Sequence, residues 1–333
     1  MAEYIGIKGS TIQTIAGDPP APGIGQIWYN STATTLKAYG KQGTGAWASG
    51  GNLNTARDAM GSAGASVSAA LANGGDPTPG LITETYNGTA WTEVGDSSNI
   101  RTQYGNSWNG TSTACIMARG AQPAPAGGPI ISATESWDGT SWTALTAAPT
   151  AARGSTGAGT STAAVVAGGY YPSNVAVTTC FEYNAPSWST GGALNTARAW
   201  MPGGGSQTAA IIAGGLNPGG VTANVEEYDG TSWTETQNIT TTRDAMGMSG
   251  AQTAQTSAIV FGGRTPGPVW KDEAEQWNGT SWTETGDLAS ARGILGGCGA
   301  SSMTALAFGG GDPKYTATEE FSVPDATKTF TAT

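Results

Sequence analysis

The stretch YDGTSW, residues 228–233, recurs along the chain in closely similar forms. The other copies are YNGTAW at 86–91, WDGTSW at 137–142, YNAPSW at 183–188 and WNGTSW at 277–282. Most copies join an aromatic residue to a closing Trp through Asp-Gly or Asn-Gly, whose residues tolerate the positive φ of a tight turn. The motif therefore predicts a β-hairpin that the chain builds several times.

The closing tryptophan of the motif marks a repeat of 44 to 51 residues. The aligned residues are Trp47, Trp91, Trp142, Trp188, Trp233 and Trp282, with Phe330 where the next would fall. An arginine follows each Trp after ten or eleven residues, at Arg57, Arg101, Arg153, Arg198, Arg243 and Arg292. A repeat of this length predicts one small structural unit that is stacked many times.

Each repeat also contains two further strand patterns. A run rich in Gly, Ala and Ser, such as GSTGAGTS (154–161), precedes an apolar run that ends in glycine, such as AAVVAGG (163–169) or AAIIAGG (209–215). With the hairpin, this makes four strands per repeat. Four-stranded units that cannot bury both faces alone stack around an axis, where small side chains avoid collisions. We predict an all-β fold, a six-bladed β-propeller.

The repeat resembles the kelch family over roughly residues 47–333. The resemblance lies in the Gly-Gly after an apolar strand, the aromatic about eleven residues later, the Trp five residues beyond it and the later Arg. The chain departs from the pattern with ARG at 118–120 in place of Gly-Gly, and with Phe181 in place of a recurrent glutamate. The glutamates elsewhere are Glu84, Glu135, Glu226, Glu275 and Glu319. We interpret the repeated arginines as structural, bonding strand-end carbonyls or this glutamate.

The two ends of the chain need a separate interpretation. The segments LKAYGKQGTGAW (36–47) and EEFSVPDATKTF (319–330) both resemble an outer hairpin, so one hairpin is surplus to six blades. Rings that resemble kelch proteins are closed by pairing the two termini in one blade. We therefore expect residues near Trp47 to pack beside the last blade, with a domain at 47–333 and an attachment segment at 1–46. A seventh blade from residues 1–47 is the alternative.

The amino-terminal region contains DPPAPGIGQIWYNSTATTLK (18–37), a Pro/Gly linker followed by an amphipathic hairpin. It resembles the short attachment element of tail-fibre and other structural proteins of tailed bacteriophages. Together with Thr/Gly/Ser-rich repeats, it resembles virion proteins from phages of marine bacteria. The resemblance implies a virion attachment role for Ile27, Trp28, Tyr29 and Leu36. An ordinary hairpin that covers the propeller edge is the alternative.

Composition excludes several classes of function. The chain has no histidine, so Ser-His-Asp and Cys-His nucleophile systems and His-containing metal sites are excluded. A net charge of −10 without a basic stripe argues against a nucleic-acid partner, and no 18-residue apolar run could span a membrane. We expect no enzyme and no cofactor. A propeller glycosidase, which needs only two carboxylates, stays open as a rival.

Loops after the apolar strands vary between repeats while sharing a proline. They are DPTPGLI (76–82), YYPSNVAV (170–177), LNPGGVT (216–222), RTPGPVW (264–270) and GDPKYTA (311–317). A constant scaffold that carries variable loops is typical of a binding surface. We expect glycan contacts, through stacking or hydrogen bonds, from Asp76, Tyr170, Tyr171, Asn217, Arg264, Trp270, Asp312 and Tyr315. Calcium at Asp76 or Asp312 is disfavoured, because no dense carboxylate loop surrounds them.

These observations together predict a non-enzymatic virion structural protein of a tailed phage, made in the host cytoplasm. Its amino-terminal segment docks to other virion proteins, and its propeller projects as a fibre tip, knob or decoration that binds a host surface polysaccharide. We expect a homo-oligomer. A cellular kelch-type adaptor for a protein partner is the first alternative, and the glycosidase is the second.

Overall fold

The computed structural model describes residues 12–76, 80–102, 105–106, 110–122, 128–250, 254–267, 269–311 and 313–330. Every regular element within these residues is a β-strand, so the predicted all-β class is confirmed. The chain divides into two compact units. The first unit comprises residues 1–45 and 323–333, and the second comprises residues 46–322.

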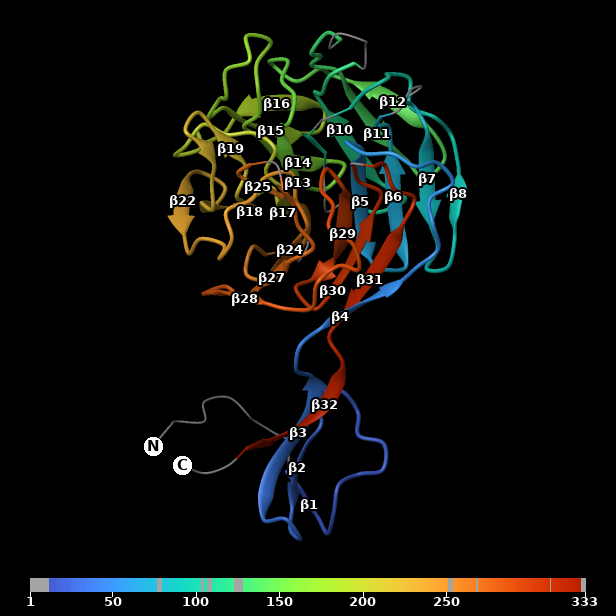
Figure 1. Cartoon of the computed structure of the whole chain (residues 1–333), viewed down its shortest axis with the longest axis vertical. Coiled ribbons are helices and arrows are strands. Elements are labelled where there is room, and N and C mark those ends of the chain that lie inside the picture. The colour runs from blue at the N-terminus through green and yellow to red at the C-terminus, as the bar shows by residue number, and fades with distance from the viewer. Residues whose placement is uncertain are drawn as a thin grey trace. The chain divides into compact units, whose positions relative to one another are not determined.

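The described part of the second unit forms six four-stranded antiparallel sheets, called here the first to sixth repeat sheets (Figure 1). The first contains β5 (Gly61–Ser66), β6 (Ala69–Asn73), β7 (Thr83–Tyr86) and β8 (Trp91–Glu93). The second contains β9 (Gly105–Asn106), β10 (Cys115–Ala118), β11 (Thr134–Trp137) and β12 (Trp142–Leu145). The third contains β13 (Thr156–Gly159), β14 (Ala163–Ala167), β15 (Cys180–Asn184) and β16 (Ser187–Thr190).

The remaining repeat sheets follow the same order of strands. The fourth contains β17 (Gly203–Ser206), β18 (Ala209–Ala213), β21 (Val225–Tyr228) and β22 (Trp233–Thr236). The fifth contains β23 (Gly247–Gly250), β24 (Ala258–Phe261), β27 (Ala274–Trp277) and β28 (Trp282–Glu284). The sixth contains β29 (Gly296–Ser301), β30 (Thr304–Phe308), β31 (Thr318–Ser322) and β4 (Ala46–Ser49). Two small ribbons are added, β19 (Leu216–Asn217) with β20 (Gly220–Val221), and β25 (Arg264–Thr265) with β26 (Val269–Trp270).

The innermost strands of successive repeat sheets contact one another, and β29 of the sixth sheet contacts β5 of the first. Small residues permit this approach: a Cβ built on Gly297 in β29 would lie 2.8 Å from the Met248 carbonyl oxygen in β23. Backbone hydrogen bonds also tie each sheet to the next. They run from Gly75 to Arg101, Gly120 to Ala152, Gly169 to Arg198, Gly215 to Arg243, Gly263 to Arg292 and Gly310 to Arg57. The small, successively packed sheets define a β-propeller-like fold.

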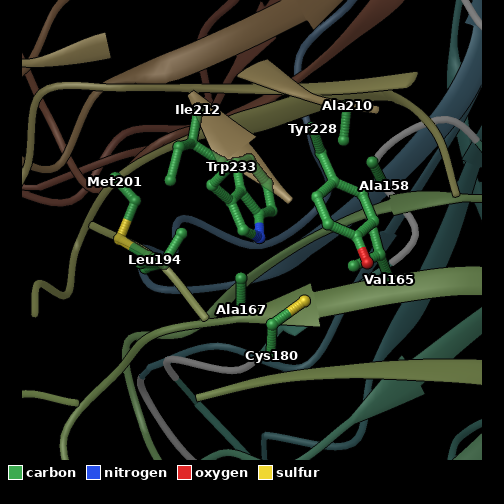
Figure 2. Packing of buried hydrophobic residues seen from close by; sticks show 10 residues of the cluster. All are labelled: Ala158, Val165, Ala167, Cys180, Leu194, Met201, Ala210, Ile212, Tyr228 and Trp233. Carbon is green, nitrogen blue, oxygen red and sulfur yellow. The ribbon is translucent and has the colours of Figure 1, made fainter. Parts of the chain in front are cut away.

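The hydrophobic core lies between neighbouring sheets. Figure 2 shows one such cluster, in which Val165 and Cys180 of the third sheet meet Ile212, Tyr228 and Trp233 of the fourth. The motif tryptophans reach the preceding sheet: the Trp91 indole donates to Thr318 Oγ1 at 2.9 Å. Aliphatic strands and aromatic rings thus share one buried layer, which supplies the stabilisation that a single four-stranded sheet lacks.

The repeated turn joins the two outer strands of a repeat sheet as a hairpin, as predicted. Tyr86 pairs directly with Trp91, so four residues form the loop. The Asn87 side chain accepts hydrogen bonds from the Thr89 and Ala90 amides, both at 2.9 Å, and Gly88 has φ +90°. Asp138, Asp229 and Asn278 accept equivalent bonds from their own turns. The Asn-x-Thr sequence here therefore serves turn geometry.

The two end segments do not form hairpins. β4 pairs with β31 in the sixth sheet and places Trp47 opposite Phe321, so a strand from near the amino end completes the last sheet. By contrast, β32 (Asp325–Phe330) pairs with β3 (Thr35–Lys41) in the first unit. Phe330 therefore does not occupy a position equivalent to the motif tryptophans of the repeat sheets. The unit boundaries therefore lie at 45/46 and 322/323. Residues 323–330 were expected in the repeat domain, but they belong to the first unit.

The first unit has one mixed four-stranded sheet. Its strand order is β1 (Gln13–Ile15), β2 (Ile27–Asn30), β3 and β32, with a parallel β1–β2 pair and antiparallel pairs elsewhere. Trp28 is fully buried in this unit. Its indole donates to Asp18 Oδ1 at 3.1 Å, and the other Asp18 oxygen forms an ion pair with Lys37 at 2.7 Å.

Candidate functional site: the loop face

The repeated arginines are structural in five of the six sheets, as predicted. Arg198 is buried in the fourth sheet, where it donates to the Gly214 and Asn224 carbonyls and pairs with Glu226 at 2.6 Å. The equivalent pairs are Arg57 with Glu84, Arg101 with Glu135, Arg243 with Glu275 and Arg292 with Glu319. These charges satisfy one another inside the scaffold and are withdrawn from ligand chemistry.

The third sheet breaks this rule through a shift of one residue. Here the backbone position of the buried arginine is filled by Ala152, whose carbonyl accepts the bond from Gly120. Arg153 takes the next position and bridges to Tyr170, where the other sheets pair Asp58 with Asp76 or Asp244 with Arg264. The eleven-residue spacing after Trp142 was therefore a sign of a displaced side chain, not of an equivalent one.

The missing buried guanidinium is supplied by the neighbouring sheet. Arg119, of the aberrant ARG segment, is fully buried and donates to the Gly168 carbonyl at 3.2 Å, which matches the Arg198–Gly214 bond. Its guanidinium lies 4.8 Å from the ring centroid of Phe181, the residue that replaces glutamate. Burial lowers the pKa of Arg119 to about 10. The two departures from the repeat, Arg119 in place of glycine and Phe181 in place of glutamate, thus contact each other.

We use the term loop face for the surface formed by residues 76, 80–82, 170–177, 216–222, 264–267, 269–270, 311 and 313–317, with the residues bridged to them. Arg153 lies on this face, half-buried, and its Nη2 donates to Asn174 Oδ1 at 2.8 Å. The Arg153 guanidinium also lies 6.0 Å from the Tyr170 ring centroid. Burial raises the pKa of Tyr170, and the charge of Asp244 adds to this against the effect of Arg153.

A second cation on the loop face is held by a carboxylate. Arg264 makes two bonds to the buried Asp244, at 3.0 and 2.7 Å, and lies 5.8 Å from the Trp270 ring centroid. A Cβ on Gly293 would come within 2.4 Å of the Trp270 ring, so this glycine makes room for the indole. The arrangement fixes both side chains, and the bidentate pair raises the pKa of Arg264.

The other expected glycan contacts are more dispersed. Asp76 forms an ion pair with Lys314, and Tyr315 lies over the buried Arg292 at 5.7 Å. The Asn217 oxygen accepts from the Gly219 amide at 2.8 Å and so is committed to its own turn. Tyr171 is half-buried beside Thr179, and Asp312 lies outside the described residues. Tyr170 therefore lies beside Arg153, and Arg264 beside Asp244, two residues that were not among the expected glycan contacts. The Asn217 oxygen is not available for a glycan contact.

A small cavity of about 60 Å³ lies where the innermost turns meet. Its lining includes Gly154, Trp200, Ala245 and Ile294, which follow the bridged loop-face positions directly. The Trp200 backbone donates to the Gly154 carbonyl and accepts from the Ala245 amide, so these turns are joined by hydrogen bonds. The sequence prediction does not include Trp200, although it is an aromatic at a position held by Ala59, Gly154, Ala245 and Ile294 in other repeats.

The expected attachment residues are divided between the two faces of the sheet in the first unit. Trp28 is buried, so it belongs to the core of the unit and is not available to a partner, contrary to expectation. Ile27 is exposed, and Tyr29 and Leu36 are partly exposed. Strand register aligns Tyr29 with Leu36 and Leu36 with Phe330, so these side chains share the face opposite Trp28.

The described residues contain no cluster of three or more His, Cys, Asp or Glu side chains suited to a metal ion. Burial raises the pKa of Cys115, Cys180 and Cys298 to about 12, so these thiols stay protonated near neutral pH. The part of the chain that the structure describes also has no helix long and apolar enough to cross a membrane.

Comparisons with known proteins support the fold alone. No family model matches the chain, and no curated protein matches it significantly. A solved structure titled "Structure of YjhT" is similar, with a TM-score of 0.68 and 14% sequence identity. The match covers 83% of this chain and 99% of that chain, and YjhT is a kelch-type propeller. The chain is therefore similar in fold to a kelch-type propeller.

Proposed function

We propose that the second unit is a single six-bladed kelch-like propeller that serves as a binding module without catalytic activity. The contact of β29 with β5 and the Gly310–Arg57 backbone bond support closure after six blades. The seven-bladed alternative is disfavoured because residues 12–45 contribute β1, β2 and β3 to a separate unit.

The proposed role of the whole chain is that of a virion structural protein of a tailed bacteriophage. One observation carries this proposal: the segment 18–37, which resembles phage attachment elements, folds with 325–330 into a compact unit of its own. The attachment surface is revised to Ile27, Tyr29, Leu36 and Phe330, because these residues share the more exposed sheet face. Other virion proteins are the proposed partners of that face.

The loop face is the proposed site for a host surface polysaccharide. Tyr170, Trp200 and Trp270 offer rings for stacking on sugars, and Arg153 and Arg264 offer hydrogen-bond donors. Aromatic platforms with a few fixed polar groups suit ring-shaped ligands. Tyr170, Arg264 and Trp270 lie in loops within their own sheets, and Arg153 and Trp200 lie in the connections between sheets. Bridges such as Arg153 to Tyr170 join the two sets.

Immunolabelling tests the virion role. Antibody raised against the recombinant chain is applied to purified tailed particles from the source of the sequence, with electron microscopy and peptide identification as readouts. Labelled particles that contain the chain are expected. Absence of the chain from every particle fraction, with the protein present in host cells, would instead favour the cellular adaptor.

A further inference from the structure

We propose that the loop face contains an anion subsite, centred on Arg153, that takes the carboxylate of an acidic saccharide. The subsite consists of Arg153, Tyr170 and Asn174, with Trp200 beside it. It deepens the proposed polysaccharide binding and rests on it, since it names the class of sugar and the group that is recognised.

The first argument is the displacement of Arg153. In the other five sheets the repeated arginine is buried and paired with a glutamate. In the third sheet the one-residue shift brings the guanidinium to the loop face, where Asn174 and Tyr170 orient it. The break in the sixfold pattern therefore places a cation on the loop face, where a ligand can reach it.

The second argument is that the scaffold compensates for this export at a cost. Arg119 supplies the buried guanidinium from a position with φ +67°, where other sheets have Gly74, Gly168, Gly214, Gly262 and Gly309 with φ of 60° to 66°. A non-glycine residue in this region costs roughly 1–2 kcal/mol. Arg119 and Phe181 together take the place of the buried arginine–glutamate pair in the third sheet, while Arg153 lies on the loop face.

The third argument concerns the surroundings of the guanidinium. A Cβ on Gly154, the residue after Arg153, would lie 3.3 Å from two ring atoms of Trp200, so the indole packs directly against this turn. Tyr170 provides a second ring. A planar guanidinium matches a carboxylate through two parallel bonds, and flanking rings suit the sugar that carries it.

The test uses the full-length chain and Arg153→Gln, which replaces the guanidinium with a shorter, uncharged polar group. Binding is measured by calorimetry against a panel of bacterial uronate-containing polysaccharides, each before and after carboxyl reduction to its neutral counterpart. Lys328→Gln in the first unit makes the same change in net charge and serves as the matched control. Circular dichroism and thermal unfolding verify that each variant is folded.

At least one uronate polysaccharide is expected to bind, with affinity falling on the order of tenfold on carboxyl reduction or in Arg153→Gln, and unchanged in Lys328→Gln. Higher salt weakens this binding, since the subsite is only half-buried. Equal binding to native and carboxyl-reduced polymers would overturn the anion subsite and leave the proposed polysaccharide function standing. No binding to any native, reduced or neutral polymer in the panel would overturn both.

Discussion

At the residue scale, the scaffold is organised by buried arginine–glutamate pairs. In the fourth sheet, the Arg198 guanidinium binds the Glu226 carboxylate and two backbone carbonyls. In the fourth sheet, Glu226 accepts from Arg198 and from both the backbone and the side chain of Asn195. A buried pair of this kind contributes specificity more than net stability, but removal of one partner leaves the other charge uncompensated. Loss of one partner therefore costs more stability than the intact pair contributes.

Glu226→Ala is expected to lower the free energy of unfolding by about 3–5 kcal/mol, because Arg198 stays buried without its carboxylate. Urea titration followed by circular dichroism measures the change. Glu235→Ala, at an exposed position in the same sheet, is the control and should shift stability by less than about 1 kcal/mol. A loss below that level in Glu226→Ala would contradict the structural role of the pair.

Arg119 gives a second prediction, because two effects oppose each other at one residue. Arg119→Gly relieves positive-φ strain but removes the bonds to Gly168 and Thr150 and the Phe181 contact. Net destabilisation of about 1–3 kcal/mol is expected, since buried carbonyl and aromatic partners are lost. Denaturant unfolding measures it, and a stabilised variant would disprove the compensating role.

The combination Arg119→Gly, Ala152→Arg and Phe181→Glu tests the same point by restoring the pattern of the other sheets. The new arginine and glutamate take the positions held by Arg198 and Glu226 in the fourth sheet. Most of the stability lost in Arg119→Gly should return. Failure to recover any stability would mean that the third sheet has diverged beyond this one contact.

The buried thiols predict a pH dependence in the alkaline range. Burial raises the pKa of Cys115, Cys180 and Cys298 from 9.0 to about 12. Between these values the folded state keeps protons that the unfolded state releases, so stability present below pH 9 falls as pH rises towards 12. The slope approaches about 1.4 kcal/mol per pH unit per thiol. Urea titrations from pH 8 to 10.5 in reductant should show this fall, and the triple Cys→Ala variant should show a smaller one.

Residue roles were predictable where the repeat is regular and not where it shifts. The pairing of arginine with the recurrent glutamate follows from the alignment, in which five of the six copies contain both residues. In the third copy the alignment predicts Arg153 as the structural arginine, but its spacing from Trp142 is eleven residues and Ala152 takes the equivalent backbone position. A sequence pattern cannot reveal that Arg119 replaces it, since that contact joins two different repeats.

At the element scale, the sixth sheet depends on a strand that is distant in sequence. Ala46–Ser49 pairs with Thr318–Ser322, and the Trp47 indole donates to the Gly286 carbonyl at 2.8 Å while packing on Phe261 and Phe321. The segments 36–47 and 319–330 both resemble hairpins in sequence, because a local pattern of alternating residues does not specify which strand will pair with which. The sequence predicted that Trp47 would lie beside the last repeat, but not that β3 and β32 would pair in the separate sheet of the first unit.

Trp47→Ala is expected to lower the free energy of unfolding by about 2–4 kcal/mol, because it removes the indole bond and two ring contacts from the closing strand. The measurement is urea unfolding monitored by far-ultraviolet circular dichroism. Ala48→Ser, on the exposed side of the same strand, is the control. Equal stability of Trp47→Ala and the parent chain would exclude β4 as an important part of the sixth sheet.

At the scale of the whole molecule, both end segments of the described chain belong to one small sheet, and the repeats lie between them in sequence. The first unit has few buried aromatic residues and depends on polar contacts around Asp18. That carboxylate accepts from Trp28 and Asn30 and forms an ion pair with Lys37. The second unit instead has apolar clusters between successive sheets. Their stabilities should therefore respond differently to pH.

Acid is expected to loosen the first unit before the second. The Lys37 and Asn30 hydrogen bonds lower the pKa of Asp18 below its usual 3.8. Stability from this group is present above pH 3.8 and is lost as pH falls through the lowered value, since protonation removes the charge that Lys37 attracts. Hydrogen exchange with mass spectrometry, corrected for intrinsic rates at pH 7 and pH 3, should show protection lost first in peptides from residues 25–41. Asp18→Asn should reduce protection at pH 7 and make it less dependent on pH, whereas Asp229→Asn in a turn of the second unit should leave these peptides unchanged. Equal acid sensitivity of these peptides in the parent chain and in Asp18→Asn would show that another group controls the first unit.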